Sequence, residues 1–368
     1  MKRYEGVPHA FAHYNHPQRG LAKSFDAGII GLYVSLALAQ RGHGRSITVL
    51  AEHLPGDTAV AYTSPWAGCN FSAISGTDAN AIRWDKAGYK FLRELEATVG
   101  EKSFVKKTPS TEMWDDVVPH DKIKAMSEYL EDFEIIPADK LPQGVKFAVS
   151  FTTVTINAPK FMEYLYARLQ NEYGVRFQRR KIDHISSAFS PSTKIVFNCT
   201  GNAARFLGGV EDAKCYPTRG QVVLVRAPRV KRNLMRHGLD YETYIIPRPG
   251  TKGHVILGGY MQKGNNDGST YKSETQSILE RTKGLSEDLR AEEPEILATV
   301  AGMRPSREGG ARVEREQREV QGQQRALVHN YGAGGTGFQA GFGMALVSVQ
   351  HVKDILATLG TARPTARL

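Results

Sequence analysis

The glycine pair in "AGIIG" is the feature that most constrains what this chain can fold into. Gly28 and Gly31 open a strongly apolar segment, "GIIGLYVSLALAQRG", which predicts a helix that ends at a glycine cap. Their spacing is typical of a dinucleotide-binding turn, where glycines let the backbone approach a pyrophosphate at a helix N-terminus. The buried-strand pattern "SITVLAE" follows, and its final acid stands where such sites bind ribose hydroxyls. We therefore expect a nucleotide to contact Ala27, Gly28, Ile29, Ile30, Gly31 and Glu52.

The residues before this turn do not fit the same pattern. Asp26 stands where the first glycine is expected, and residues 1–25 show neither helical nor strand periodicity. A carboxylate there would repel a diphosphate, and its Cβ would crowd a tight turn. We therefore expect the first apolar strand to be missing. We infer that residues 1 to about 27 come from a wrong start, a retained intron or a faulty gene model; a chain made as written would retain its cofactor weakly and fold marginally.

Composition excludes several classes of protein. The chain has 368 residues, enough for two domains, and a net charge of +10 that is spread among 38 acidic residues. We expect no nucleic-acid partner, because no aromatic stripe accompanies the basic residues. Its three cysteines match no disulfide framework or metal site, so no metal is expected. The longest near-apolar segment is too short to cross a bilayer, which predicts no membrane insertion.

The C-terminus carries a tripeptide that resembles a targeting signal. Its last residues, Ala366-Arg367-Leu368, form a small-basic-leucine tripeptide related to the peroxisomal Ser-Lys-Leu signal. We expect a peroxisomal import receptor as a partner and the peroxisome matrix as the location.

Strand and helix patterns alternate at both ends of the chain and enclose a strand-rich block. Residues 105–150 are polar and turn-rich, whereas "GQVVLVRAP", "TYIIPRPG" and "HVILGGY" predict short strands. A second glycine-rich turn, "HNYGAGGTGFQAGFG", joins a strand to a helix, and its glycines favour close approach of a planar ligand. The predicted fold is α/β, with a Rossmann-type domain from discontinuous segments (1–78, 150–213 and 296–368) and an antiparallel-sheet substrate domain (79–149 and 214–295).

A set of motifs then carries a family likeness over nearly the whole chain. They are "TSPWAGCNF", "FNCTGNAARFLGG", "TRGQVVLV", "TYIIPRPG", "GMRPSREGGARVE" and "HNYGAGGTGFQAGFG". In this order and spacing the chain resembles the FAD-dependent D-amino-acid oxidases, most of all the fungal ones. The resemblance implies FAD as cofactor and hydride transfer from the α-carbon of a D-amino acid to the flavin. The products would be a 2-oxo acid, ammonia and, from dioxygen, hydrogen peroxide; the family also makes a homodimer plausible.

The resemblance assigns residues to this site. Arg304 matches the arginine that binds the substrate carboxylate, a task suited to a planar two-donor group, and Tyr244 matches the tyrosine whose hydroxyl contacts the same carboxylate. The backbone of "GGTGFQ" would face the flavin and stabilise its reduced form. The implied catalytic residues are Arg304, Tyr244 and Gln339. The substrate would also contact Tyr241, Tyr260, Met261 and Gly335. FAD would contact Ser64, Ala67, Gly68, Ile182, Arg304, Gly334, Gly335, Gly337, Phe338 and Gln339.

Substrate preference depends on the segment "GGYMQKGN". The related D-aspartate oxidases carry an arginine close after the glycine pair, whereas this chain has Tyr260 and Met261. We therefore expect neutral D-amino acids as substrates. The alternatives are a D-aspartate oxidase, a glycine/sarcosine-type amine oxidase, and a catalytically inactive FAD-binding homologue, which Asp26 would allow.

Overall fold

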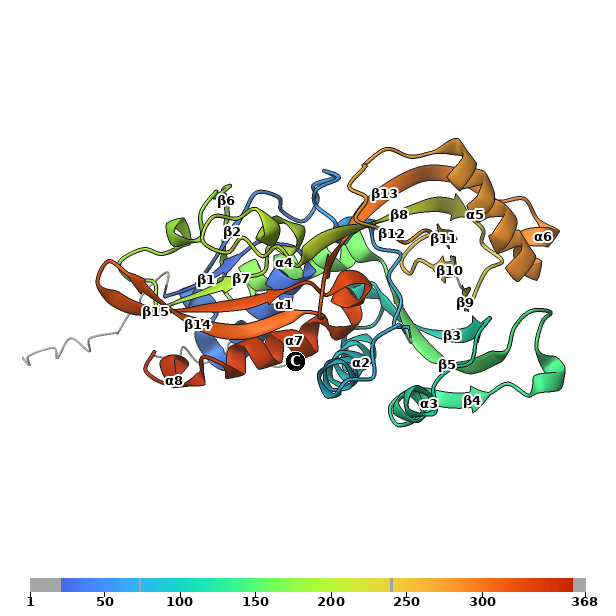
Figure 1. Cartoon of the computed structure of the whole chain (residues 1–368), viewed down its shortest axis with the longest axis horizontal. Coiled ribbons are helices and arrows are strands. Elements are labelled where there is room, and N and C mark those ends of the chain that lie inside the picture. The colour runs from blue at the N-terminus through green and yellow to red at the C-terminus, as the bar shows by residue number, and fades with distance from the viewer. Residues whose placement is uncertain (1–20, 73, 239–240, 360–368) are drawn as a thin grey trace, which may run out of the picture.

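The computed structural model describes residues 21–72, 74–238 and 241–359. Two sheets organise these residues, one at each end of an elongated molecule (Figure 1). Their strands come from interleaved stretches of the chain, which confirms the α/β fold with a Rossmann-type part built from discontinuous segments. No helix in the described ranges has the length and apolar character needed to cross a membrane.

The first sheet has six strands in the order β14-β15-β7-β1-β2-β6. Five of them run parallel, and β14 pairs antiparallel with β15 at one edge. Their bounds are β1 (Ala22–Phe25), β2 (Ile47–Ala51), β6 (Arg176–Arg179), β7 (Ile195–Asn198), β14 (Arg312–Val320) and β15 (Gln323–Tyr331).

The position of β1 corrects the sequence-based expectation of a missing first strand. β1 lies at the centre of this sheet, where Ala22 pairs with Ile47 on one side and with Ile195 on the other. The strand carries Lys23 and Ser24 in its middle, so it offers no apolar run. Its place in the fold is therefore set by two neighbouring strands, and residues 22–25 are not irregular.

Helices form the main core with the first sheet. They are α1 (Ile29–Leu38), α2 (Ala79–Val99), α4 (Ala158–Asn171), α7 (Gly337–Gln350) and α8 (Lys353–Leu356). Of these, α1 and α7 lie on the sheet, α4 packs against α1, and α2 packs against α7. Gly42, at φ +87°, follows α1 as the predicted glycine cap. α1 packs closely on α7, because a Cβ at Gly341 would lie 2.8 Å from Ile30 Cδ1.

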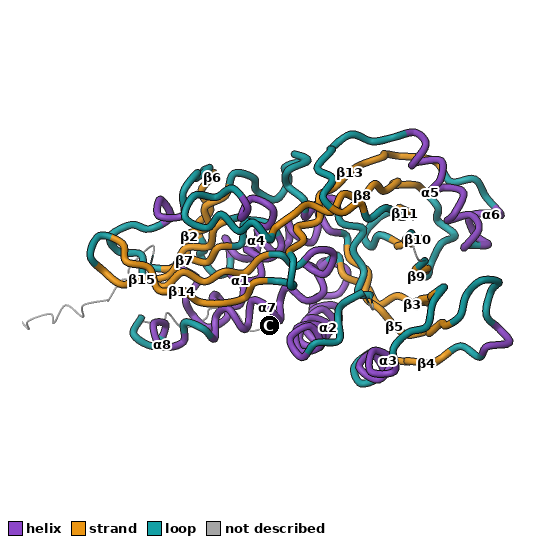
Figure 2. Tube along the Cα trace, viewed as in Figure 1, coloured by secondary structure: helices purple, strands orange, loops and turns teal. Residues whose placement is uncertain are grey.

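The second sheet has nine strands and is almost wholly antiparallel. Its order is β12-β8-β11-β10-β9-β3-β5-β4, with β13 also paired to β8; only β3 and β9 run parallel. The bounds are β3 (Val105–Trp114), β4 (Glu131–Ile135), β5 (Phe147–Ile156), β8 (Cys215–Arg226), β9 (Asn233–His237), β10 (Glu242–Pro247), β11 (His254–Gly258), β12 (Gln262–Lys263) and β13 (Glu295–Arg307). Helices α3 (His120–Ser127), α5 (Lys272–Leu285) and α6 (Glu287–Ala291) accompany this sheet (Figure 2).

Sheet membership differs from the sequence-based boundaries at two places. The boundary expected at residue 150 falls inside β5, and β13 belongs to the second sheet although residues 296–307 were expected in the cofactor domain. Residues 105–150, expected to be turn-rich, contain β3, β4 and the start of β5. β8 and β13 are long and extend from the second sheet toward the first (Figure 1).

Candidate active site

The turn between β1 and α1 has the close geometry of a dinucleotide-binding loop. A Cβ at Gly31 would lie 1.9 Å from the carbonyl oxygen of Asp26, so only glycine lets the helix pack against this strand end. Gly28 is the N-cap of α1, and no side chain caps it. The Ile29 N–H donates to Ser64 Oγ at 3.1 Å, which joins the "SPWAG" segment to the start of the helix. The Ile29 N–H is thus held by Ser64, and the α1 N-terminus offers the partial positive charge of an anion site.

Asp26 fits this turn at an energetic cost. It has a φ of +95°, a left-handed conformation that suits glycine. Its N–H donates to Leu50 O at 2.9 Å, and its Oδ1 accepts from the Ala27 N–H at 2.8 Å. Burial raises the pKa of Asp26 to about 6, despite the backbone N–H groups of Ala27 and Gly28 that favour its ionised form. The carboxyl group is thus folded into the turn but is poorly solvated as an anion.

Glu52 follows β2 at the same edge of the sheet as Asp26. Its carboxylate forms an ion pair with Lys181 at 3.4 Å and is about half exposed. Ile182, the next residue after that lysine, is buried in a cluster with Phe25. The structure therefore brings Glu52 and Ile182 to the strand ends beside the α1 turn, where a nucleotide is expected.

The second glycine-rich turn leads into α7, whose N-terminus lies beside that of α1. A Cβ at Gly337 would lie 3.5 Å from the Ile29 side chain, and Phe338 O accepts from the Tyr33 hydroxyl at 3.1 Å. The N-termini of α1 and α7 therefore lie side by side, and each carries a partial positive charge. FAD fits these residues: its diphosphate would be held by the α1 turn and its flavin by the backbone around Gly335.

Gln339 is buried and its amide group is fully engaged. Its Nε2 donates to Ser72 O at 3.0 Å and to Ser75 Oγ at 2.9 Å, and its Oε1 accepts from the Ser72 N–H at 3.1 Å. Asp85, whose pKa burial raises to about 6, lies 3.3 Å from the same Nε2. The side chain of Gln339 therefore anchors the segment after "SPWAG" to α7, and a catalytic part for it stays a prediction.

Arg304 lies where the two sheets meet. Its Nη2 donates to Tyr244 Oη at 3.3 Å and its Nη1 to Tyr260 O at 3.0 Å. Within residues 21–72, 74–238 and 241–359, no carboxylate forms an ion pair with this guanidinium. A Cβ at Gly335 would lie 3.8 Å from Arg304 Cδ, so the flavin-facing turn lies against the arginine. The cation is thus oriented by neutral oxygens and keeps its charge for an anionic ligand.

Tyr244 completes this arrangement. It is 7% exposed and packs in a small cluster on the face of the second sheet that meets the "SPWAG" segment. A Cβ at Gly68 would lie 3.5 Å from the Tyr244 ring. The structure therefore brings Arg304, Tyr244, Gly335 and Gly68 together; their contact with substrate or FAD stays a prediction.

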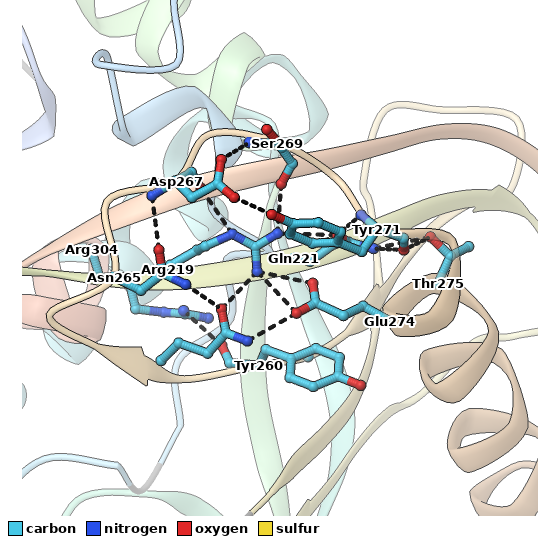
Figure 3. A network of polar contacts seen from close by, with 12 residues as sticks. Arg219, Gln221, Tyr260, Asn265, Asp267, Ser269, Tyr271, Glu274, Thr275 and Arg304 are labelled. Carbon is cyan, nitrogen blue, oxygen red and sulfur yellow. Dashed lines mark hydrogen bonds and ion pairs between the residues drawn. The ribbon is translucent and has the colours of Figure 1, made fainter.

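The other residues predicted to contact the substrate have different surroundings from Arg304 and Tyr244. The Tyr241 and Tyr260 rings both lie against Arg281 of α5, at 5.8 and 5.3 Å from its guanidinium carbon, and Met261 is 60% exposed. Tyr260 thus reaches Arg304 through its carbonyl oxygen while its ring packs elsewhere (Figure 3). Their contact with substrate stays a prediction.

The structure also reveals site residues that the sequence reasoning missed. A Cβ at Gly220 would lie 2.1 Å from Arg304 Nη1, so a side chain at this position would displace the guanidinium. Met235 pairs with Tyr244 across β9 and β10, and its sulfur lies 3.1 Å from Asn70 Nδ2. The motif "TRGQ" contains Gly220, but only the pairing of β8 with β13 shows that this glycine lies beside Arg304.

Behind Gly220, a buried arginine fixes the segment that follows Tyr260. Arg219 is fully buried, and its guanidinium contacts the Glu274 carboxylate at 2.9 Å and Gln262 Oε1 at 2.7 Å (Figure 3). It also donates to the carbonyl oxygens of Asp267 and Ser269. All its donors have partners, so this network holds the loop after β12 firmly against β8.

Comparisons with known proteins agree with this geometry. Residues 27–350 match the family described as FAD dependent oxidoreductase (DAO). Solved structures of L-proline dehydrogenase from P. horikoshii (TM-score 0.72, 15% identity) and glycine oxidase from Geobacillus kaustophilus (TM-score 0.69, 18% identity) share the fold. Each comparison covers 95% of this chain, and 96% and 100% of the other chain respectively. The chain belongs to the FAD dependent oxidoreductase family, and its cofactor is FAD.

Relatives in sequence place the chain more closely within the FAD dependent oxidoreductase family. The chain is 45% identical over 329 residues to a D-amino-acid oxidase of Schizosaccharomyces pombe, which covers 88% of this chain and 93% of the relative. A D-aspartate oxidase of Cryptococcus neoformans var. grubii is 30% identical and covers 87% and 93%. More particularly, then, the chain is a member of the D-amino-acid oxidase family.

Proposed function

We propose that this protein oxidises neutral D-amino acids to 2-oxo acids, with release of ammonia and hydrogen peroxide. One observation carries the proposal: Arg304 keeps an unpaired guanidinium beside the Tyr244 hydroxyl and the Gly335 turn. The isoalloxazine of FAD supplies the two-electron acceptor that such an oxidation needs.

The chain's own groups would bind and orient the substrate. The Arg304 guanidinium offers charge-assisted hydrogen bonds to the α-carboxylate, and Tyr244 Oη offers a further donor. Held in this way, the α-carbon can face the turn at Gly335, and the buried surroundings of Tyr244 exclude water from that side.

The preference for neutral side chains rests on the surroundings of the site. Val222, Met235 and Ile246 line the same face of the second sheet as Tyr244. Arg304 itself is needed for the α-carboxylate, and the segment after the glycine pair carries Tyr260 and Met261 in place of an arginine that could hold a side-chain carboxylate. The 30% identical D-aspartate oxidase keeps the alternative open for testing.

A direct test is the visible spectrum of the purified protein before and after anaerobic addition of D-alanine. Bleaching of the flavin band supports substrate binding and oxidation together; a stable spectrum supports the inactive homologue. Aerobic assays of peroxide release should then give a higher kcat/KM for D-alanine or D-methionine than for D-aspartate or glycine. The reverse order would support the D-aspartate or glycine/sarcosine alternative.

Peroxide formation would suit a peroxisomal matrix enzyme, and the tripeptide Ala366-Arg367-Leu368 supports that location. These residues lie outside the described ones, so the support is from sequence alone. A fluorescent fusion that ends in the native tripeptide should enter peroxisomes, and deletion of Leu368 should leave it in the cytosol. Dioxygen as electron acceptor and assembly as a homodimer are proposed on family likeness and can be tested by oxygen consumption and by mass in solution.

A further inference from the structure

A second cationic cavity lies apart from the Arg304 site. It has a volume of about 450 Å³ and opens between the first turn of α4 and the turn that joins β10 to β11. Asn157 Nδ2 donates to Pro249 O at 3.0 Å, which ties these two elements together at the cavity wall. Arg248 follows β10 and lies four residues beyond Tyr244, about 13 Å along an extended chain. Arg248 and Arg304 therefore lie at different places in the fold.

Arg248 is a cation without a counter-charge. Its Nε is buried and has no hydrogen-bond partner, and its Nη2 reaches Ala67 O only at 3.5 Å. Across the parts of the chain that the structure describes, no carboxylate pairs with it. Burial lowers the pKa of Arg248, yet a guanidinium keeps its proton in proteins. An unpaired guanidinium in such surroundings is costly unless an anion accompanies it.

The other groups around the cavity leave this positive charge uncompensated. Glu163 is the acidic residue among those lining it, and Lys160 Nζ already holds its carboxylate at 2.8 Å. His254 lies on the opposite wall, and burial together with Arg226 and Arg248 lowers its pKa, so the imidazole is neutral at pH 7. The formal balance of the lining groups is therefore one positive charge.

The start of α4 adds a second attraction for anions. α4 has 14 residues, and its N-cap Asn157 makes no side-chain capping bond; its Nδ2 donates to Pro249 O. Pro159 in this first turn has no N–H, so the Ala158 and Lys160 N–H groups supply the partial positive charge at this end of the helix.

We propose that this cavity is a binding site for a small oxyanion, a carboxylate or phosphate group, held by the Arg248 guanidinium. A planar guanidinium presents parallel donors that match both groups. The Arg248 guanidinium reaches Ala67, which precedes Gly68 of the Arg304 arrangement, and the oxyanion would be a ligand distinct from the amino-acid substrate.

The test uses the FAD-saturated holoenzyme and its melting temperature, followed by flavin fluorescence. Sodium phosphate and sodium acetate are added separately, against sodium chloride at equal ionic strength. In the unaltered protein we expect at least one of the two oxyanions to raise Tm by about 3–6 °C at saturation. In Arg248→Met this rise should disappear, while Tm without added oxyanion should equal or exceed that of the unaltered protein, because an unpaired charge has been removed.

Lys252→Met is the matched control, since this lysine is an exposed cation on the same turn and does not line the cavity. It should keep the full response to oxyanions. A response to acetate alone would assign the site to carboxylates, and a response to phosphate alone would assign it to phosphate groups; both support the proposal if they depend on Arg248.

Three results would overturn it. The first is no rise in Tm of the unaltered protein with either anion, and the second is a response of Arg248→Met as full as that of the unaltered protein. The third is a variant that loses FAD and melts at a lower temperature without added oxyanion, which would make Arg248 a cofactor-supporting residue instead.

Discussion

Replacement of Asp26 by glycine should strengthen FAD binding and stabilise the fold above pH 6. Asp26 holds a φ of +95°, and a non-glycine residue in such a conformation costs about 1–3 kcal/mol. Glycine removes this strain but loses about 0.5–1 kcal/mol through the greater freedom of the unfolded chain. The hydrogen bond from the Ala27 N–H to Asp26 Oδ1, worth about 1 kcal/mol, is lost as well. These conformational contributions nearly cancel, so charge decides the outcome.

The charge contribution follows from the pKa of Asp26, which burial raises from 3.8 to about 6. The folded protein therefore binds this proton more tightly than the unfolded chain, and stability falls as pH rises from about 4 to 6. Above pH 6 the ionised Asp26 costs the fold about 3 kcal/mol. A diphosphate at the neighbouring α1 N-terminus would add repulsion to this cost. Asp26→Gly should remove both effects at pH 8 and change little near pH 4.

The assay is titration of the apoprotein with FAD, followed by the change in flavin fluorescence, at pH 5 and pH 8. At pH 8 we expect Asp26→Gly to lower the Kd for FAD by about 10- to 100-fold, the equivalent of about 1.4–2.8 kcal/mol. Asp26→Asn is the matched control, because it removes the charge and keeps a side chain at the positive φ. It should recover most of the gain. Equal or weaker FAD binding by both variants at pH 8 would refute the electrostatic reasoning.

Three further predictions concern residues that shape the site. Gly31→Ala should lower the free energy of unfolding by about 3 kcal/mol in urea titrations, because its Cβ would lie 1.9 Å from Asp26 O; unchanged stability would contradict the tight turn. Arg304→Lys should keep the flavin spectrum and lower kcat/KM for D-alanine about 100-fold, mainly through KM. Glu274→Met should lower the free energy of unfolding by about 3–5 kcal/mol, because Arg219 is then buried without a carboxylate to balance its charge. The double variant Arg219→Met with Glu274→Met should have a free energy of unfolding closer to that of the unaltered protein. Additive losses of stability from the two substitutions would contradict the pairing.

The sequence indicated the fold class, both glycine-rich turns and the pair Arg304 and Tyr244. These features are local: a glycine spacing, a helix start or a motif carries them within a few residues. Strand β3 was missed because its buried face is polar, with Thr108, Ser110 and Glu112 among its buried residues. Such residues give no apolar alternation, so the strand becomes evident only when neighbouring strands satisfy their hydrogen bonds.

The surroundings of Arg304 could be predicted only in part. The residue itself stands in a recognisable motif, but the closeness of Gly220 to the guanidinium arises because Gly220 of β8 pairs with Gly302 of β13, 82 residues further along the chain. The same holds for Tyr260, because the sequence does not show that its carbonyl oxygen, and not its ring, contacts the Arg304 guanidinium. A sequence motif identifies a side chain, whereas backbone groups and cross-strand glycines depend on the tertiary register.

The N-terminal turn shows how these limits led to a wrong expectation. The polar centre of β1 and the aspartate at position 26 suggested that the chain before Gly28 was foreign. The structure instead gives β1 a parallel partner on each side, and Asp26 donates its N–H to Leu50 O as a residue continuing from that strand. Residues 22–25 are therefore part of the sheet; residues 1–20 lie outside the described ones, and the inference of a wrong start stays a prediction. What distinguishes this turn is one carboxyl group whose pKa lies near 6, so cofactor affinity should depend on pH in a way that glycine at this position would abolish.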